Sequence, residues 1–296
     1  MEQLEQFYAI YGSLINFIGI NALLALSLNV TLAAGMLSLG NAAFAGIGGY
    51  AAGILTVHLK TPYIVSLGGG ALLSGVVALL LGIPVLRLRG VFLAMATLAF
   101  GEVVRIAAVN LNITGGAEGL TGIPKVTEIW SIYLILALAA YFVAVLRRSQ
   151  LGWGLVSIRE DETAAACLGI PVISYKLWAF VIGAILSGLA GGMYAHLNYL
   201  ITPRDFGFFI AVDLLAYNIV GGTPFWYGPI LGAALLTALP EILRGVGVAA
   251  GPIRMGVSGL ILLLVILFLP NGLASLIERV KNTGMRTAES GIGKAG

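Results

Sequence analysis

Long apolar stretches, separated by short polar segments, make up most of the chain. From Gln6 to Leu59 there is no Lys, Arg, Asp or Glu, which is enough for two membrane-spanning helices, because one helix needs about 20 apolar residues to cross about 30 Å of hydrocarbon. Full-length apolar stretches occur at 8–31, 35–57, 63–83, 91–111, 128–146, 177–198 and 253–270. They are longer than the strands of a membrane barrel and do not alternate with period two, so the pattern predicts helices.

The stretch 207–240 is also apolar, but Gly221-Gly222-Thr223-Pro224 and then Gly228-Pro229 interrupt it. The pieces 207–221 and 227–240 have about 15 residues each, or about 22 Å of helix, which is short of a full crossing. We expect two short spans or a re-entrant pair. The predicted fold is therefore an all-α polytopic bundle of about nine spans, in a range of about 8–10, with one broken or re-entrant helical segment and a short cytoplasmic helix.

The distribution of basic residues predicts the orientation, because cytoplasmic loops of membrane proteins carry an excess of Lys and Arg. If the N-terminus lies outside, the pairs Arg87/Arg89 and Arg147/Arg148 and the segment 279–294 fall on the cytoplasmic side, as does the C-terminus. We expect one transmembrane domain at 1–282, with a cytoplasmic loop at 149–176. The small, polar segment 283–296 is expected to be a disordered cytoplasmic tail.

Composition supports the membrane assignment and narrows the chemistry. The chain is 59% hydrophobic and 10% charged, whereas soluble domains have about 25% charged residues. The net charge of +3 comes from scattered basic residues, which gives no sign of nucleic-acid binding. The sequence has no phosphate-binding loop, His58 and His196 lie far apart, and Cys167 is the single cysteine. We therefore expect no catalytic residues, no metal site and no cofactor.

The polar loop 149–176 contains a predicted helix. Ser157-Ile158-Arg159-Glu160 reads as a capping box, and acidic residues near a helix start are favoured by the helix dipole. Gly169 suits the position after the helix, and Pro171 prevents its continuation. The result is a helix of about eleven residues, about 16 Å long. The residues expected to matter on this helix are Ser157, Arg159, Glu160, Asp161, Glu162, Ala165, Leu168 and Gly169.

This helix allows two interpretations, a helix lying on the membrane surface or a docking element for a cytoplasmic partner. Its Ala-rich face favours close packing in a groove, whereas lipid association prefers bulky apolar residues and a basic face.

Polar residues within the apolar stretches are candidates for a translocation path, because ionisable groups are costly in a membrane. The polar candidates are Asn41, Glu102, Arg105, Asp213 and Asn218. Gly221 and Gly222 are candidates for another reason, because interrupted apolar segments often mark substrate sites. For the charged residues, the asparagines and the glycines alike, a purely structural role stays open as the alternative to a place in the translocation path. Glu102 and Arg105 can pair within one helix, the asparagines can bond between helices, and the glycines can form a tight packed turn.

Small residues recur every four positions in the stretch 177–198. Such spacing lets helix backbones approach closely in a membrane. We therefore expect this helix to pack centrally among its neighbours or near a subunit interface, through Gly183, Ser187, Gly188, Gly191 and Gly192.

Several strings, in order along nearly the whole chain, carry a family resemblance. They are Thr97–Arg105, Asn112–Leu120, Ser157–Glu162, Leu168–Ile170, Tyr175–Leu177, Gly221–Gly222 with Gly228–Pro229, and Pro270–Leu273. With these strings the chain resembles the M-type permease subunits of ABC importers for branched-chain amino acids. It departs from the pattern at Thr223-Pro224-Phe225-Trp226, where relatives tend to have a small Gly-containing turn.

The resemblance implies a non-catalytic transport subunit in a bacterial or archaeal inner membrane, surrounded by lipid. It implies three kinds of protein partner: a homologous H-type permease, two cytoplasmic ATPases, and a periplasmic or lipid-anchored substrate-binding protein. It also implies that the helix Arg159–Gly169 is the coupling helix that docks on an ATPase.

Two other functions stay open. One is a permease of the same architecture for urea or short amides. The other is an ion- or proton-coupled secondary transporter, in which Asp213, Glu102 and Arg105 would form the coupling site.

Overall fold

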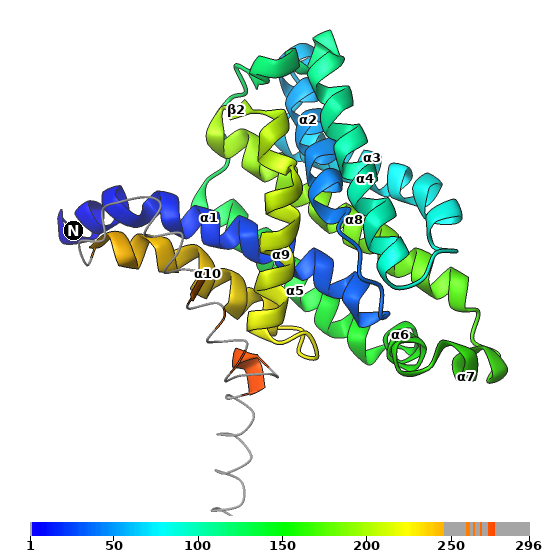
Figure 1. Cartoon of the computed structure of the whole chain (residues 1–296). Coiled ribbons are helices and arrows are strands. Elements are labelled where there is room, and N and C mark those ends of the chain that lie inside the picture. Colours follow the sequence, from blue (N-terminus) through cyan, green and yellow to red (C-terminus); the bar gives the residue numbers. More distant parts are fainter. Residues whose placement is uncertain (1, 246–258, 261–262, 264–266, 268–271, 276–296) are drawn as a thin grey trace, which may run out of the picture.

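The computed structural model describes residues 2–245, 259, 260, 263, 267 and 272–275. In Figure 1 the described part of the chain is a bundle of helices, and the longest connection within 2–245 is the one between α4 and α5. The helices are α1 (Glu2–Ala33), α2 (Asn41–Leu59), α3 (Tyr63–Val85), α4 (Val91–Asn110), α5 (Ile129–Arg148), α6 (Gln150–Glu160), α7 (Glu162–Cys167), α8 (Val172–Asn198), α9 (Phe208–Gly221) and α10 (Gly228–Gly245).

Six of these helices, α1 to α5 and α8, are long and apolar enough to cross a membrane. The predicted stretches 63–83 and 91–111 match α3 and α4 within a few residues, and Pro62 and Gly90 are the residues just before these helices. The all-α polytopic bundle is therefore confirmed, whereas the count of nine spans is not. The expected span 253–270 and the tail 283–296 lie outside the described residues, apart from a few single positions.

Helix α8 lies at the centre of the bundle and packs against α1, α2 and α3. Its small residues face these neighbours. A Cβ added to Gly191 would overlap the carbonyl group of Ala45 on α2, and one added to Gly188 would lie 2.8 Å from Ser74 Cβ on α3. Toward α1, the hydroxyls of Ser187 and Ser27 lie 2.7 Å apart. The structure thus places the small residues of α8 at interfaces within this chain.

The other two small residues predicted to pack, Gly183 and Gly192 of α8, also lie against neighbouring helices. A Cβ on Gly183 would lie 2.9 Å from the carbonyl oxygen of Ser27, and one on Gly192 would lie 3.2 Å from Ala52 Cβ.

The broken apolar segment forms two helices, α9 and α10, separated by residues 222–227. Gly222 has φ of +103°, a conformation that favours glycine. Beyond the break, α10 runs antiparallel to α1, since Asn29 Nδ2 donates to the carbonyl oxygen of Thr223 and Asn21 Nδ2 donates to Thr237 Oγ1. The predicted interruption is confirmed.

One element escaped the all-α prediction. The strands β1 (Leu120–Thr121) and β2 (Leu200–Ile201) form a two-stranded antiparallel sheet, in which Leu120 pairs with Ile201. Three short 3-10 helices flank it: η1 (Asn112–Thr114), η2 (Gly116–Glu118) and η3 (Pro203–Phe206). Strands of two residues carry no periodic signal in a sequence. In Figure 1, β2 lies far from α6 and α7.

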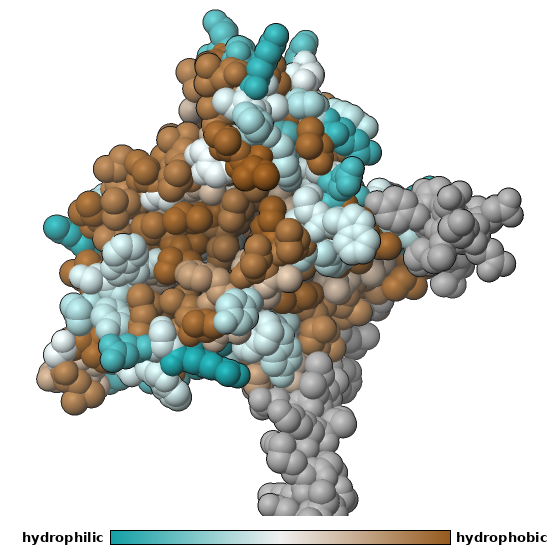
Figure 2. Space-filling model, turned by 180° about the vertical axis from the view of Figure 1, so that it is seen from behind, coloured by the Kyte–Doolittle hydropathy of each residue, from teal (hydrophilic) through white to brown (hydrophobic). Residues whose placement is uncertain are grey.

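The outer surface is largely apolar. Figure 2 shows hydrophobic residues over the middle of one face, with hydrophilic residues gathered mainly toward its upper and lower ends. Exposed apolar side chains come mostly from α3, α4 and α5, for example Leu80, Phe92 and Leu138. Such a band suits contact with lipid or with another membrane subunit.

Candidate functional site

The connection between α5 and α8 contains two helices, α6 and α7, where the sequence predicts one. Ser149 caps α6 by accepting a hydrogen bond from the amide of Gly152 at 3.3 Å. Ser157 lies inside α6, and its hydroxyl donates to the carbonyl oxygen of Trp153 at 3.0 Å. The predicted capping box at Ser157-Ile158-Arg159-Glu160 is therefore wrong.

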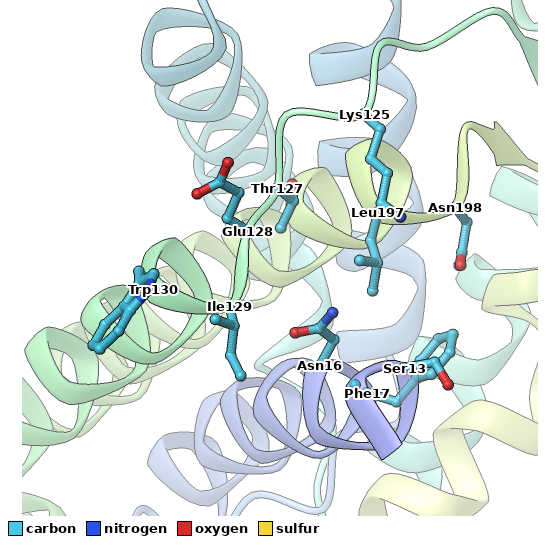
Figure 3. A pocket seen from close by; sticks show the side chains of 11 residues that line it. Ser13, Asn16, Phe17, Lys125, Thr127, Glu128, Ile129, Trp130, Leu197 and Asn198 are labelled. Atoms are coloured by element: carbon cyan, nitrogen blue, oxygen red, sulfur yellow. The ribbon is translucent and has the colours of Figure 1, made fainter. Parts of the chain in front are cut away.

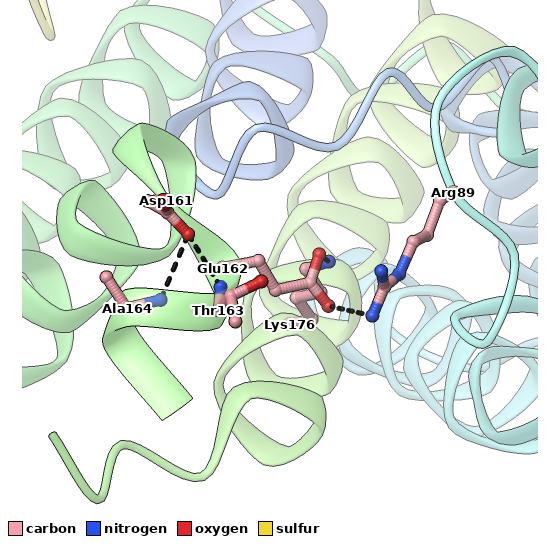
Figure 4. Close-up of polar contacts among 6 residues, drawn as sticks. All are labelled: Arg89, Asp161, Glu162, Thr163, Ala164 and Lys176. Atoms are coloured by element: carbon pink, nitrogen blue, oxygen red, sulfur yellow. Dashed lines mark hydrogen bonds and ion pairs between the residues drawn. The ribbon is translucent and has the colours of Figure 1, made fainter. Parts of the chain in front are cut away.

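The second helix begins at a different cap. Asp161 has an extended backbone, and its carboxylate accepts hydrogen bonds from the amides of Thr163 at 2.8 Å and Ala164 at 3.0 Å (Figure 4). A carboxylate that satisfies two free amides at a helix start is a strong cap. The helix predicted in this loop is therefore the six-residue α7, about 9 Å long, rather than eleven residues.

The end of α7 matches the prediction. Gly169 has φ of +84°, its amide donates to the carbonyl oxygen of Ala166 at 3.0 Å, and the amide of Ile170 donates to that of Ala165 at 3.1 Å. These paired bonds close the helix through a left-handed glycine, and Pro171 follows.

Glu162 joins α7 to the bundle. Its Oε2 lies 2.7 Å from Nζ of Lys176 on α8, and its Oε1 lies 3.6 Å from Arg89 in the loop after α3 (Figure 4). Lys176 is 8% exposed, so this ammonium group depends on its partner. The sequence indicates only a favourable charge near a helix start, whereas the structure shows a link from α7 to the central helix.

The faces of α7 differ sharply. Ala165 is 2% exposed and packs inward, so its predicted place among the docking residues is wrong. Leu168 is 80% exposed, and Ala164 and Cys167 are also exposed. We call these three residues the α7 face. At the end of α6, Arg159 and Glu160 form an exposed ion pair of 3.0 Å.

A polar cluster holds the break between α9 and α10. Arg147, at the end of α5, donates to Asn29 Oδ1 at 2.6 Å, to the carbonyl oxygen of Thr223 at 3.2 Å, and to that of Pro224. Asn218 is fully buried, accepts from Asn29 at 3.2 Å, and donates to the carbonyl oxygen of Ala25 at 2.9 Å. We call these five residues the Arg147 cluster: Asn29, Arg147, Asn218, Thr223 and Pro224.

The sequence does not reveal the role of Arg147, because an arginine beside Arg148 at the end of an apolar stretch looks like an ordinary loop charge. Asn218, by contrast, stands out as a polar residue inside an apolar stretch, and the structure uses it between helices.

Asn41 also joins helices. It is 2% exposed, and its Nδ2 donates to Ser27 Oγ at 3.1 Å, which in turn contacts Ser187 on α8. Its Oδ1 has no hydrogen-bond partner among the described residues. Asn41 therefore contributes to the contact of α1, α2 and α8.

The three charged candidates, Glu102, Arg105 and Asp213, do not form one site. Arg105 Nε donates to Glu102 Oε2 at 2.7 Å within α4, as expected of a structural pair. Asp213 is exposed on α9 and makes no ion pair with any residue that the structure describes. Gly221 and Gly222 form the packed turn itself, where a Cβ on Gly221 would overlap the carbonyl group of Gly228.

The described part of the chain contains no group of three or more His, Cys, Asp and Glu that could hold a metal. His196 is fully buried between the carbonyl oxygen of Gly192 at 2.8 Å and Thr56 Oγ1 at 2.9 Å, as a satisfied structural histidine would be.

The described part of the chain is thus an apolar helical bundle of the multi-pass membrane class, with a short, anchored helix pair at one end. Residues 10–266 match the family described as the branched-chain amino acid transport system permease component, and the chain belongs to this family. It is 33% identical over 258 residues to the high-affinity branched-chain amino acid transport permease LivM of Salmonella typhimurium and to that of Escherichia coli. Each alignment covers 75% of this chain and 61% of LivM, so the chain spans about three fifths of those relatives.

A more distant relative carries a different name. The L-arabinose ABC transporter permease AraH of Azospirillum brasilense is 25% identical over 262 residues, which is 83% of this chain and 75% of AraH. No solved structure matches the chain. The resemblance to M-type permeases is confirmed at the level of the family, and these relatives are named as transport permeases.

The Arg147 cluster generates a stability prediction. Replacing Arg147 with Met is expected to lower the free energy of unfolding by about 2–3 kcal/mol, because a charged donor to three acceptors is lost. Unfolding of the purified chain in detergent measures the effect. Arg148→Met is the matched control, since Arg148 is the adjacent, exposed arginine. Equal destabilisation by both changes would contradict a specific role for Arg147.

Proposed function

We propose that this chain is the membrane-spanning permease subunit of an ABC importer that carries leucine, isoleucine and valine by alternating access. ATP hydrolysis takes place in partner chains. The observation that carries the proposal is the position of α7, whose apolar residue Leu168 is exposed while Glu162 is bonded into the central helix. Membership in the permease family and the names of the LivM relatives support the cargo.

The α7 face is the proposed docking surface for an ATPase. An exposed leucine flanked by small residues fits a groove. The small neighbours have too little side-chain bulk to hold the partner at a distance. A force on α7 then reaches α8 through Glu162 and Lys176, and reaches the loop after α3 through Arg89. Since α8 contacts α1, α2 and α3 closely, a displacement of its end moves the bundle as a body.

The proposed orientation puts α6, α7 and the C-terminus in the cytoplasm and the N-terminus outside. The ends of α3 and α5 near α7 carry Arg87, Arg89, Arg147 and Arg148, which agrees with the excess of positive charge on the inner side.

A second, homologous H-type permease is proposed to complete the pore. Asp213 is exposed on an apolar helix, where lipid would penalise its charge, so this face of α9 suits a partner subunit or a water-filled path. Phe209, 81% exposed on the same helix, adds apolar contact area. Two ATPases and a periplasmic or lipid-anchored binding protein complete the proposed assembly.

Two alternatives compete with this proposal. A permease for urea or short amides would share the architecture, and the arabinose name of one relative illustrates that similar chains are assigned different cargo. An ion-coupled transporter would need a coupling site from Asp213, Glu102 and Arg105. Glu102 is bonded to Arg105 instead, which favours a structural role for that pair.

Uptake into vesicles that contain the chain with its partner subunits tests the function. Labelled leucine is expected to enter only with ATP on the ATPase side, because the chain has no nucleotide-binding motif of its own. Excess isoleucine or valine should compete, whereas urea should not, and a proton ionophore should leave uptake intact. Uptake that needs a proton gradient and no ATP would establish the ion-coupled alternative, and competition by urea would change the cargo.

Docking through the α7 face has a separate test. Leu168→Glu is expected to reduce co-purification of the ATPase about tenfold or more, since an unpaired charge would enter an apolar contact. Leu59→Glu is the matched control, because Leu59 is 65% exposed at the end of α2. If Leu168→Glu retains the ATPase as well as Leu59→Glu does, α7 is not the docking element.

A further inference from the structure

A hollow of about 880 Å³ lies at the end of the bundle away from α6 and α7. Helix α5 starts at this hollow with Ile129 and ends beside α6, about 30 Å further along its axis. The walls come from α1, the segment before α5, the start of α5 and the end of α8 (Figure 3). Its volume is in the range of about 300–1,000 Å³ that small-molecule sites occupy.

A buried amide with an unused acceptor lies in this wall. Asn16 is 9% exposed, and its Oδ1 accepts no hydrogen bond from any residue that the structure describes. Figure 3 shows its side chain rising from α1 toward Thr127 and Leu197 on the opposite side. Thr127 is itself buried and donates to the hydroxyl of Tyr63 at 3.1 Å. A buried amide oxygen normally has a donor, so Asn16 has capacity for a ligand N–H group.

Two charges of opposite sign line the same hollow. Lys125 and Glu128 lie on either side of Thr127 in Figure 3, and both are exposed. Neither forms an ion pair within the part of the chain that the structure describes. Lys125 Nζ lies 5.4 Å from the centre of the Tyr199 ring. This contact leaves the N–H groups of Lys125 able to bind an anion.

The rest of the lining is apolar. Phe17, Ile129 and Leu197 contribute side chains from three different helices, and Phe17 is fixed by Tyr194, with ring centres 6.2 Å apart. An ammonium group, a carboxylate and a branched aliphatic side chain would each find a complementary surface here.

We propose that this hollow is an entry site for a zwitterionic amino acid with an aliphatic side chain. Lys125 binds the carboxylate, Glu128 and Asn16 Oδ1 receive the ammonium group, and the side chain lies against Phe17, Ile129 and Leu197. The assignment rests on the proposed function for its cargo, but it names residues that no similarity between sequences identifies.

Saturation-transfer NMR on the purified full chain in lipid nanodiscs tests the site with three probes. These are L-leucine, 3-methylbutylamine, which lacks the carboxylate, and 4-methylpentanoate, which lacks the ammonium group. Glu128→Gln is expected to weaken the amine about tenfold and leave the acid unchanged, whereas Lys125→Gln should do the reverse, because each change removes one charge-assisted hydrogen bond. Both residues are exposed, so neither change should prevent folding.

Lys60→Gln and Glu118→Gln are matched controls, because both are exposed charged residues outside the lining of the hollow. Selective losses at Lys125 and Glu128, with no change in the controls, would support the site. Equal binding of all probes by all variants would overturn it.

Leucine uptake by the complete assembly separates this inference from the proposed function. Specific binding by the chain without ATP-driven uptake would refute the function and leave the site standing. Normal uptake and normal binding by Lys125→Gln and Glu128→Gln would refute the site and leave the function standing.

Discussion

The close approach of α8 to three neighbouring helices is the constraint on which the rest of the structure depends. Apolar side chains gain little by leaving lipid for a protein interior, so helices in a membrane associate through tight backbone contact and hydrogen bonds between helices. Helix α8 uses both. Gly188 and Gly191 bring it against α3 and α2, and Ser187 meets Ser27 of α1 at 2.7 Å. A larger side chain at either glycine would separate backbones that now touch.

This packing makes α8 suitable for transmitting a movement. Lys176, near its start, is bonded to Glu162 of α7, and at the other end Leu197 contributes to the hollow lined by Lys125 and Glu128. One helix therefore connects the proposed ATPase contact with the proposed entry site. The Arg147 cluster fixes the broken segment to α1 and α5, so the break between α9 and α10 is a built feature.

The sequence predicts those parts of the fold that follow from local patterns. Apolar length places the spans, including the starts of α3 and α4, and Gly169 ends α7. Local patterns fail where two local signals compete. Ser157 and Asp161 are both residue types that cap helices, but Ser157 lies inside α6, and Asp161 caps α7 by accepting from two amides.

The candidate site was less predictable, because it depends on how distant segments pack together. The exposure of Leu168 and the burial of Ala165 depend on how α7 lies against the bundle, which no spacing of residues reveals. Arg147 reads as a loop charge until its three acceptors come together in space. The hollow around Asn16 joins residues more than a hundred positions apart, and no motif marks it.

Maleimide labelling of Cys167 tests the central claim, that α7 is the contact through which a cytoplasmic partner moves the bundle. Cys167 is the single cysteine of the chain and is exposed on the α7 face, so the native protein needs no further change. The account predicts rapid labelling from the cytoplasmic side in the permease alone and strong protection in the complex with its ATPase. Labelling from the outer side, or equal labelling with and without the ATPase, would contradict it.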